Sequence, residues 1–442
     1  MNTPATKLRV AYMTGEYPRA TDTFIQREVA ALRAGGTHVQ TFSVRKPHNK
    51  ENVGPETQAE LERTYYVFPP RAGKILAAHA KVFAASPGRY LRAVKTALTV
   101  RPAGLKALVW QAAYFVEAGV VAREVKRQDL SHLHNHFSNS SCSVAMLAAE
   151  MGGFTFSFTM HGPMEFFEPK YWRLDEKIRR ALFVACISHF CRSQGMIFGP
   201  QDKWARMHVV HCGVDPALFE PARHEGVGHR LLFVGRLAGV KGLPVLLDAV
   251  AAVAKIHPDV RLTLAGDGPD RARLTAQAER LGIASNVVFL GYRSQAQVRE
   301  LLREADVFVM GSFAEGVPVV LMEAMAAGVP VVATQVAGIP ELVEAGVNGM
   351  LVPPGDPAAL ATAVAALVAD PELRLQFGRR GREKVLAEFD IHAEAARLGA
   401  VLTAALQGEV LPIRPAVPGD ATGCPAERTA PRVAPTQRAL SA

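Results

Sequence analysis

Cysteine is scarce in this sequence of 442 residues, and its five cysteines are scattered. Their number is odd and no Cys-x-x-Cys pair occurs, which argues against a disulfide framework or a zinc ribbon and suits a reducing compartment. Leu8 to Tyr12 is typical of a strand and lies so near the first residue that we expect no signal peptide. No uncharged apolar run approaches the ~18 residues that cross a bilayer.

The three-glycine fingerprint of nicotinamide-binding domains is also absent, which argues against a dehydrogenase. The turn after the first predicted strand carries a single glycine, Gly15. Because open α/β sheets bind ligands at the carboxyl ends of their strands, Gly15 would let the backbone approach a bound molecule.

Acidic residues are missing between Arg63 and Val116. Basic residues are interspersed with apolar residues in this stretch. The pattern predicts basic amphipathic helices that suit anionic lipid or a lipid diphosphate. An ordinary solvated helix pair over the sheet would show the same pattern. Nucleic acid is disfavoured, although the net charge is +9, because no nucleic-acid-binding motif accompanies the charge. The basic residues are Arg63, Arg71, Lys74, Lys81, Arg89, Arg92, Lys95, Arg101 and Lys106.

Two glutamates eight positions apart, Glu315 and Glu323, frame the most informative stretch of the chain. A buried strand from Ala305 precedes them, and a helix that Pro318 can open separates them. Free N–H groups and the dipole at such a helix start favour a phosphate. Acids beside a phosphate site predict a sugar nucleotide, with hydroxyls for the acids and a pyrophosphate for the helix.

This pair, followed by Glu-Ala-Met-Ala-x-Gly-x-Pro-Val-Val from Glu323, resembles the donor signature of the retaining GT-B glycosyltransferases of family 4. The resemblance assigns Glu323 to the ribose hydroxyls and Glu315 to hydroxyls of the sugar ring. The family's usual Glu-Gly-Phe-Gly-Leu is here Glu-Gly-Val-Pro-Val, so Pro318 removes one backbone donor and leaves the donor sugar open. A UDP-hexose is favoured over GDP-mannose.

Further motifs support the same donor site. The turn after a predicted strand carries Gly-Arg-Leu and then Lys-Gly, so Arg236 and Lys241 stand five positions apart. Such a pair of cations can bind a diphosphate. The Gly-Asp-Gly-Pro turn and the strand before Tyr292 match segments that the family places next to the nucleoside. The predicted donor-binding residues are Gly15, Arg236, Lys241, Gly266, Asp267, Tyr292, Glu315, Gly316, Val317, Val319, Val320 and Glu323.

The N-terminal half carries weaker motifs. Thr23-Phe24-Ile with Arg-Glu after it resembles the acceptor-domain motif of exopolysaccharide glycosyltransferases of the colanic-acid type. Three histidines alternate along a possible strand; they suggest zinc only weakly because no fourth ligand stands at a zinc-site spacing. The resemblance instead carries His136 into the cleft between domains on the acceptor side, with Thr23 and Phe24, and leaves His132 a structural or exposed residue. It also makes His161, which ends a strand before Gly162, a catalytic residue that faces the donor sugar.

The resemblance implies an α/β fold of the GT-B type, in which two Rossmann-like, doubly wound domains face each other across a cleft. Arg236, Lys241 and the helix start near Val319 would stabilise the leaving diphosphate without a metal or other cofactor. The reaction would be front-face transfer with retention, catalysed by His161, Glu315, Arg236 and Lys241. We expect an N-terminal acceptor domain over 1–219, a hinge over 220–230, a nucleotide-sugar domain over 231–390, a crossover helix over 391–407 and a disordered tail over 408–442.

The predicted function is transfer of a hexose from a nucleotide diphosphate sugar to a lipid-linked saccharide in surface polysaccharide synthesis. We expect a cytoplasmic protein that sits peripherally on the inner face of the cytoplasmic membrane. Two alternatives stay open: a GT-B nucleotide-sugar epimerase, and a protein that binds glycan or lipid without catalysis. The four intact residues Arg236, Lys241, Glu315 and Glu323 disfavour the second.

Overall fold

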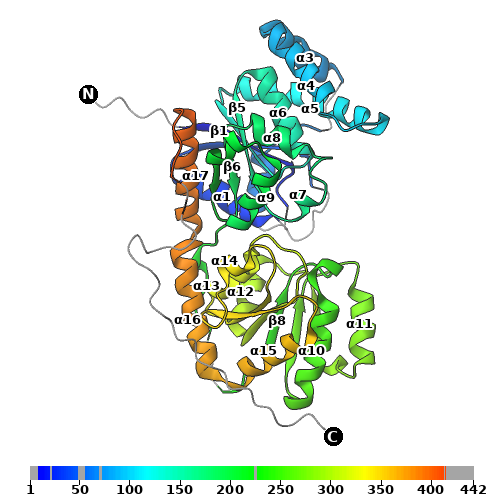
Figure 1. Ribbon diagram of the computed structural model, residues 1–442, viewed down its shortest axis with the longest axis vertical. Coiled ribbons are helices and arrows are strands. Elements are labelled where there is room, and N and C mark those ends of the chain that lie inside the picture. Colours follow the sequence, from blue (N-terminus) through cyan, green and yellow to red (C-terminus); the bar gives the residue numbers. More distant parts are fainter. Residues whose placement is uncertain are drawn as a thin grey trace, which may run out of the picture.

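The structure is a computed structural model that describes residues 8–19, 22–47, 55–68, 72–222, 226–412 and 414. Two parallel β-sheets form two domains, stacked along the longest axis of the molecule (Figure 1). The predicted tail beyond 414 and the basic residue Arg71 lie outside the described residues. The prediction of two doubly wound α/β domains is confirmed.

The N-terminal sheet has seven parallel strands in the order β3-β2-β1-β4-β5-β6-β7. Its chain order reverses between β1 and β4, and ligands bind at such a point in open parallel sheets. The strands are β1 (Arg9–Glu16), β2 (His38–Arg45), β3 (Tyr65–Tyr66), β4 (His132–His136), β5 (Thr155–Met160), β6 (Val184–Cys186) and β7 (Met207–Val209).

Helices cover both faces of this sheet. One face packs against α1 and α17 through residues such as Ile25, Val29 and Leu398, whereas α5, α6 and α8 cover the other face. The helices are α1 (Thr23–Ala34), α2 (Pro55–Arg63), α3 (Ala72–Ala85), α4 (Pro87–Thr99), α5 (Leu105–Arg127), α6 (Ser140–Gly152), α7 (Met164–Phe167), α8 (Leu174–Arg180) and α9 (His189–Phe198).

The C-terminal sheet has six parallel strands in the order β10-β9-β8-β11-β12-β13, so its chain order reverses between β8 and β11. The strands are β8 (Arg230–Val234), β9 (Arg261–Ala265), β10 (Val287–Gly291), β11 (Val307–Met310), β12 (Val331–Thr334) and β13 (Gly349–Val352). The helices are α10 (Leu243–Ile256), α11 (Arg271–Arg280), α12 (Gln295–Glu304), α13 (Val319–Ala326), α14 (Ile339–Leu342), α15 (Pro357–Ala369) and α16 (Pro371–Glu388).

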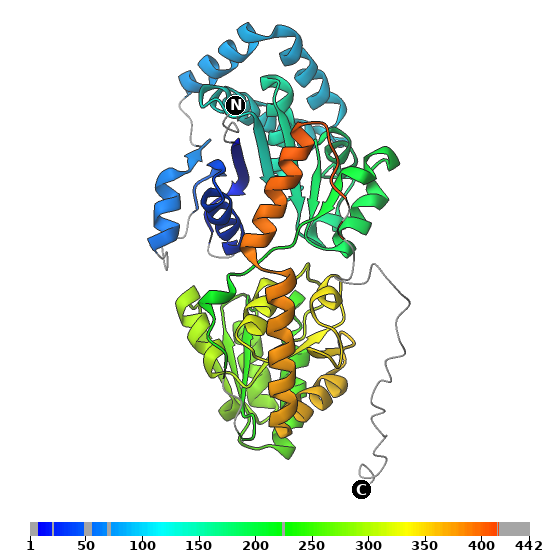
Figure 2. The ribbon, with the colours of Figure 1, turned by 90° about the vertical axis from the view of Figure 1, so that its left-hand side faces the viewer.

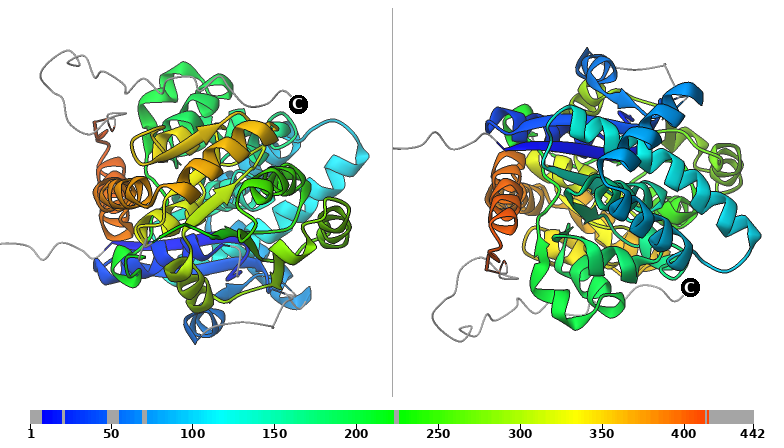
Figure 3. Two further views of the ribbon diagram at one scale, coloured as in Figure 1. Left: turned by 90° about the horizontal axis from the view of Figure 1, so that it is seen from below. Right: turned by 90° about the horizontal axis from the view of Figure 1, so that it is seen from above.

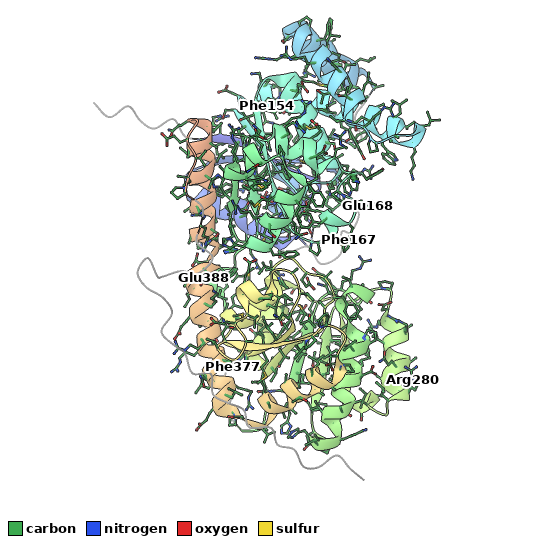
Figure 4. All side chains as sticks on the ribbon, in the orientation of Figure 1. Phe154, Phe167, Glu168, Arg280, Phe377 and Glu388 are labelled. Atoms are coloured by element: carbon green, nitrogen blue, oxygen red, sulfur yellow. The ribbon has the colours of Figure 1, made fainter. Side chains whose placement is uncertain are left out.

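The last helix, α17 (Ile391–Leu406), crosses back to the N-terminal domain, as predicted. Figures 1 and 2 show α16 and α17 as one column along the side of both domains, and Glu388 at their junction lies level with the boundary (Figure 4). Val214 ties this junction to the N-terminal domain: its N–H donates to Phe389 O and its carbonyl accepts from Ile391 N, both at 3.0 Å. The limits of the domains and of the hinge stay a prediction.

The segment without acidic residues, 63–116, includes α3, α4 and the first half of α5. These helices, called the acid-poor layer below, project at the far end of the N-terminal domain (Figure 1). From above, the cyan helices of this layer lie over the domain (Figure 3). By length and composition, α5 is the only helix among the described residues that could cross a membrane. Packing accounts for its apolar composition, because Ala118, Val121 and Val125 belong to the domain core beside α6.

Local differences from the predicted elements have physical reasons. The first strand is longer than predicted and runs to Glu16, because β2 pairs with it through Glu16. The strand β6 is only three residues long, Val184–Cys186, since the Ser188 side chain accepts from Cys191 N and starts α9 there. Pro318 lies at the N-cap of α13 with extended backbone angles, one position before the first turn.

Candidate functional site

Lys241 and Glu315 meet where the chain order of the C-terminal sheet reverses. Lys241 follows β8 and Glu315 follows β11, and Lys241 Nζ donates to Glu315 Oε1 over 2.6 Å. Both side chains are largely buried, with 22% and 11% exposed. The predicted phosphate cation and sugar carboxylate therefore neutralise each other, and an anionic donor would compete with Glu315 for Lys241.

The other donor-site residues follow the neighbouring strands β8, β9 and β10. Arg236 follows β8 with an exposed side chain, and the described residues offer it no ion pair. Gly266 follows β9 at φ 147°, and a Cβ there would collide with the Gly235 carbonyl, so only glycine lets these two loops touch. Asp267 is exposed and lies 3.6 Å from Arg271. Tyr292 follows β10; it is 42% exposed, and partial burial raises the pKa of its hydroxyl.

The N-terminus of α13 supplies backbone donors to the same place. The amides of Val319 and Val320 open the helix, so they have no intrahelical acceptor, whereas Leu321 N already donates to Pro318 O. Gly316 and Val317 form the approach to the helix, and Glu323 lies in its second turn with 4% exposed. Cations, amides and carboxylates thus converge on one edge of the sheet, an arrangement that can hold a sugar nucleotide and stabilise a leaving diphosphate.

The two domains touch at this edge through two glycines, Gly162 of the N-terminal domain and Gly316 of the C-terminal domain. Gly162 follows β5 at φ 130°, and a Cβ there would lie 2.8 Å from the Gly316 Cα. A Cβ on Gly316 would in turn collide with the His161 carbonyl. Side chains at either position would therefore keep the domains apart, and the sequence His161-Gly162 lies directly against Glu315-Gly316.

A buried carboxylate fixes the His161-Gly162 turn. Glu165 accepts from the backbone N–H groups of Ser138 and His161, and from Gly162 N at 3.2 Å. Burial raises the Glu165 pKa, which these hydrogen bonds partly offset. Glu165 thereby joins the ends of β4 and β5 at the cleft.

The His161 ring points into the N-terminal domain and ends a chain of polar contacts. Tyr12 OH donates to Glu28 Oε1 over 2.6 Å, and Glu28 Oε1 lies 3.2 Å from His136 Nε2. His136 Nδ1 is 2.9 Å from His161 Nε2, and His161 Nδ1 is 3.8 Å from Cys212 Sγ. Burial and the neighbouring His136 hold the His161 pKa well below its usual range, so His161 is neutral.

The other histidines of β4 are fully buried and hydrogen-bonded to hydroxyls. His132 is buried and lies 2.7 Å from both Thr155 Oγ1 and Ser157 Oγ, as a structural residue would, and it is not exposed. Ligand atoms of Glu28, His134 and His136 lie within 4.8 Å of one another, as a metal site would require. However, both nitrogens of His134 already face hydroxyls, at 2.7 and 2.8 Å. The group fits a hydrogen-bond network better than a zinc site.

Phe24 and Thr23, predicted on the acceptor side, begin α1 at the same edge. The Phe24 ring lies 4.8 Å from the His161 ring and 6.4 Å from the Phe137 ring, measured between centroids. The structure thus brings Phe24, His136 and His161 together around the ends of β4 and β5, and Thr23 precedes Phe24 in α1.

Gly15 lines a cavity of about 480 Å³ in the N-terminal domain, and none of the other predicted donor-binding residues lines this cavity. The cavity opens where the chain order reverses between β1 and β4, and a Cβ on Gly15 would touch nothing within 4 Å. Aromatic rings and basic side chains line it: Trp110, Tyr114, Tyr171, Trp172, Arg45 and Lys106. Glu117 also lines it, and burial raises the Glu117 pKa to about 7.

Two contacts between the domains were not foreseen from the sequence. Arg27 on α1 pairs with Glu323 on α13, Nη2 to Oε1, at 2.5 Å. Glu341 on α14 accepts from the N–H groups of His189 and Phe190 at the start of α9, each at 2.7 Å. Arg27 lies on the polar side of its helix, and a polar helical face gives no sign of which distant residue it will meet. Sequence reasoning also missed Glu28, Glu165 and Glu341, because no sequence motif indicates their partners.

Comparisons with known proteins agree with this geometry. A family model described as Glycosyltransferase Family 4 matches residues 22–218, and one described as Glycosyl transferases group 1 matches residues 217–384. Over 425 residues the chain is 27% identical to the putative colanic acid biosynthesis glycosyltransferase WcaL of Escherichia coli K12, covering 90% of this chain and 100% of the relative. It is 33% identical over 207 residues to the amylovoran biosynthesis glycosyltransferase AmsK of Erwinia amylovora, covering 45% and 50% of the two chains.

Among solved structures, Anabaena Alr3699/HepE in complex with UDP and glucose is similar, with a TM-score of 0.68. The sequences are 18% identical, and the match covers 89% of this chain and 99% of that one. At this identity the likeness shows the fold, which is GT-B. The two family models together span residues 22–384, and the chain belongs to the group 1 glycosyltransferases of family 4, which are retaining, metal-independent enzymes that use nucleotide sugars.

Proposed function

We propose that this enzyme transfers a hexose from a UDP-hexose to a lipid-linked saccharide during synthesis of a surface polysaccharide. The observation that carries the proposal is the pairing of Lys241 with Glu315 directly beneath the His161-Gly162 turn. The proposal is supported because a cation suited to a phosphate, a carboxylate suited to sugar hydroxyls and the N-terminal domain meet there. Similarity to WcaL over nearly the whole chain supports the polysaccharide pathway, and the UDP and glucose of the HepE complex support the donor.

The chemistry follows from the charges that develop. Breaking the bond between the anomeric carbon and the diphosphate leaves negative charge on the phosphate oxygens, which Lys241, Arg236 and the α13 amides stabilise. The acceptor hydroxyl attacks from the same face, its proton passes to the departing phosphate, and the configuration is retained. No protein nucleophile is required for this step.

The acceptor would occupy the cavity beside Gly15. Its aromatic walls suit the apolar faces of sugar rings, and polar groups among them can fix the hydroxyls. Arg45 and Lys106 suit the phosphates of a lipid carrier. Lys106 and Trp110 belong to α5, so the cavity is continuous with the acid-poor layer of helices.

That layer would hold the enzyme peripherally on the inner face of the cytoplasmic membrane. Its exposed residues include Lys74, Lys81, Arg89 and Arg92. Large apolar side chains on the same helices are exposed as well, among them Leu76 (72%), Leu91 (59%) and Leu105 (77%). Basic residues with exposed apolar side chains are the features of a helix that lies in the surface of an anionic membrane.

The test is transfer of label from a UDP-hexose into the lipid-linked fraction of membranes, with parent enzyme and Glu315→Gln. The proposal predicts label in the lipid fraction for the parent and its loss in the variant. Proton NMR with the sugar nucleotide alone is the companion measurement. Epimerisation of the sugar without an acceptor would overturn the proposal in favour of an epimerase, and failure to bind any sugar nucleotide would overturn it in favour of a non-catalytic protein.

A further inference from the structure

Arg27 is the side chain by which the N-terminal domain enters the predicted nucleoside site. It lies on α1, whose apolar residues Ile25 and Val29 pack inward. Its Nη2 donates to two residues on different helices of the C-terminal domain, Glu323 on α13 and Gln295 at the start of α12. The guanidinium therefore bridges three helices across the cleft.

Both members of the Arg27–Glu323 pair are shielded from water, with 18% and 6% of their side chains exposed. An ion pair held away from water depends on having all its donors and acceptors satisfied. Here that condition is not met: Arg27 Nη1 is buried and has no hydrogen-bond partner among the described residues. This unpartnered nitrogen belongs to the guanidinium that pairs with Glu323, the carboxylate that the family resemblance assigns to the ribose.

We propose that Arg27 is a donor-binding residue supplied by the N-terminal domain. Its Nη2 holds Glu323 Oε1, which leaves Glu323 Oε2 for a ribose hydroxyl, and its Nη1 donates to an oxygen of the bound nucleotide. This inference rests on the proposed nucleotide-sugar site and adds a residue to it. Because Arg27 belongs to the other domain, nucleotide binding stabilises the closed arrangement of the domains.

The donor also adds negative charge beside this pair. When a diphosphate takes Lys241 from Glu315, the cleft holds two carboxylates and a diphosphate beside Lys241 and Arg236 of the C-terminal domain. Arg27 supplies a third cation from the N-terminal domain. A residue that merely competed with the ribose for Glu323 would have to leave on binding, whereas a donor-binding residue stays.

Calorimetry with UDP, GDP, ADP and dTDP distinguishes these roles in the parent and three single variants. Arg27→Ala removes all contacts of the guanidinium. Arg27→Lys keeps the positive charge but loses the two Nη groups, and Gln295→Ala removes one acceptor of Nη2. The control is Arg303→Ala on α12, whose exposed side chain pairs with Glu300 in its own helix. We expect the affinity for the bound nucleotide to fall at least tenfold in Arg27→Ala, less in Arg27→Lys and least in Gln295→Ala, with the control unchanged.

A second readout separates a direct role from general damage to the fold. Removing the ribose 2′-hydroxyl should weaken binding to the parent, and this penalty should shrink by at least half in Arg27→Ala and Arg27→Lys, because Glu323 is no longer held. Small-angle scattering should show that the nucleotide compacts the parent but not Arg27→Ala. Unchanged or tighter binding in both Arg27 variants, or an undiminished 2′-hydroxyl penalty, would overturn the inference while leaving the proposed function intact. A parent that binds none of the four nucleotides would overturn both.

Discussion

The two glutamates of the signature differ in their surroundings, and this predicts different defects. Glu315 pairs with Lys241 of its own domain, whereas Glu323 is held by Arg27 of the other domain. Glu315→Gln should lower turnover while UDP affinity stays within a few fold. Glu323→Ala should weaken UDP binding even without the sugar, and it leaves Arg27 unpaired. Steady-state kinetics and calorimetry on both variants check this, and identical behaviour of the two variants would contradict the separate roles.

The raised pKa of Glu117 predicts that the free energy of unfolding depends on pH. Burial raises its pKa to about 7 in the fold, against an unfolded value near 4.5. The folded state thus binds the proton more tightly, so this group favours folding below pH 4.5, and the advantage is lost as the pH rises to 7. The loss is at most about 3 kcal/mol.

Thermal unfolding at pH 5 and pH 8 tests this linkage. The Glu117→Gln side chain cannot titrate, so the unfolding temperature of this variant should fall less than that of the parent between pH 5 and pH 8. A loss of about 2 kcal/mol in the unfolding free energy of the parent corresponds to a difference of roughly 4–8 °C. Equal shifts in parent and variant would show that Glu117 does not titrate in this range.

At the scale of elements, the helices α3 to α5 carry the membrane proposal. Each Lys or Arg near an anionic surface contributes about 1 kcal/mol, and the attraction is screened over ~8 Å at physiological salt. We expect binding to vesicles of anionic lipid that weakens with added salt and is absent on neutral vesicles. Changing Lys74, Lys81, Arg89 and Arg92 together to Gln should lower it without changing nucleotide affinity.

The matched control changes four exposed basic residues of the C-terminal domain to Gln, namely Lys255, Arg273, Arg280 and Arg303. Arg280 lies on α11 in the opposite domain from α3 to α5 (Figure 4). Equal sedimentation of the two quadruple variants with anionic vesicles would mean that overall charge, not this layer, drives binding.

At the scale of the whole molecule, the sequence predicted the fold because local motifs encode it. The same motifs put the C-terminal residues of the candidate site at one edge of the sheet, and their roles stay a prediction. Gly235-Arg236 and Glu315-Gly316 each follow a short apolar strand, and parallel strands bring their carboxyl ends to one edge. The pairing of Lys241 with Glu315 follows from that topology.

Contacts between domains were beyond prediction. Arg27 and Glu323 are 296 positions apart, and neither helix pattern identifies the other as a partner. The cavity beside Gly15 was missed for the same reason, since Arg45, Trp110 and Tyr171 come from separate elements. His161 was expected to direct its ring at the donor, yet both ring nitrogens face His136 and Cys212, and its carbonyl faces Gly316.

The central claim is that the strand-end cations Arg236 and Lys241 hold a nucleotide diphosphate, and calorimetry of UDP, GDP, ADP and dTDP with the parent, Arg236→Ala and Lys241→Ala tests it most directly. A lost charge-assisted contact costs about 1.5–3 kcal/mol, which is roughly a tenfold to hundredfold loss of affinity. We predict that the parent binds at least one diphosphate and that each variant binds it more weakly by this factor. Binding of equal strength in the parent and both variants, or no binding by the parent, would contradict the account.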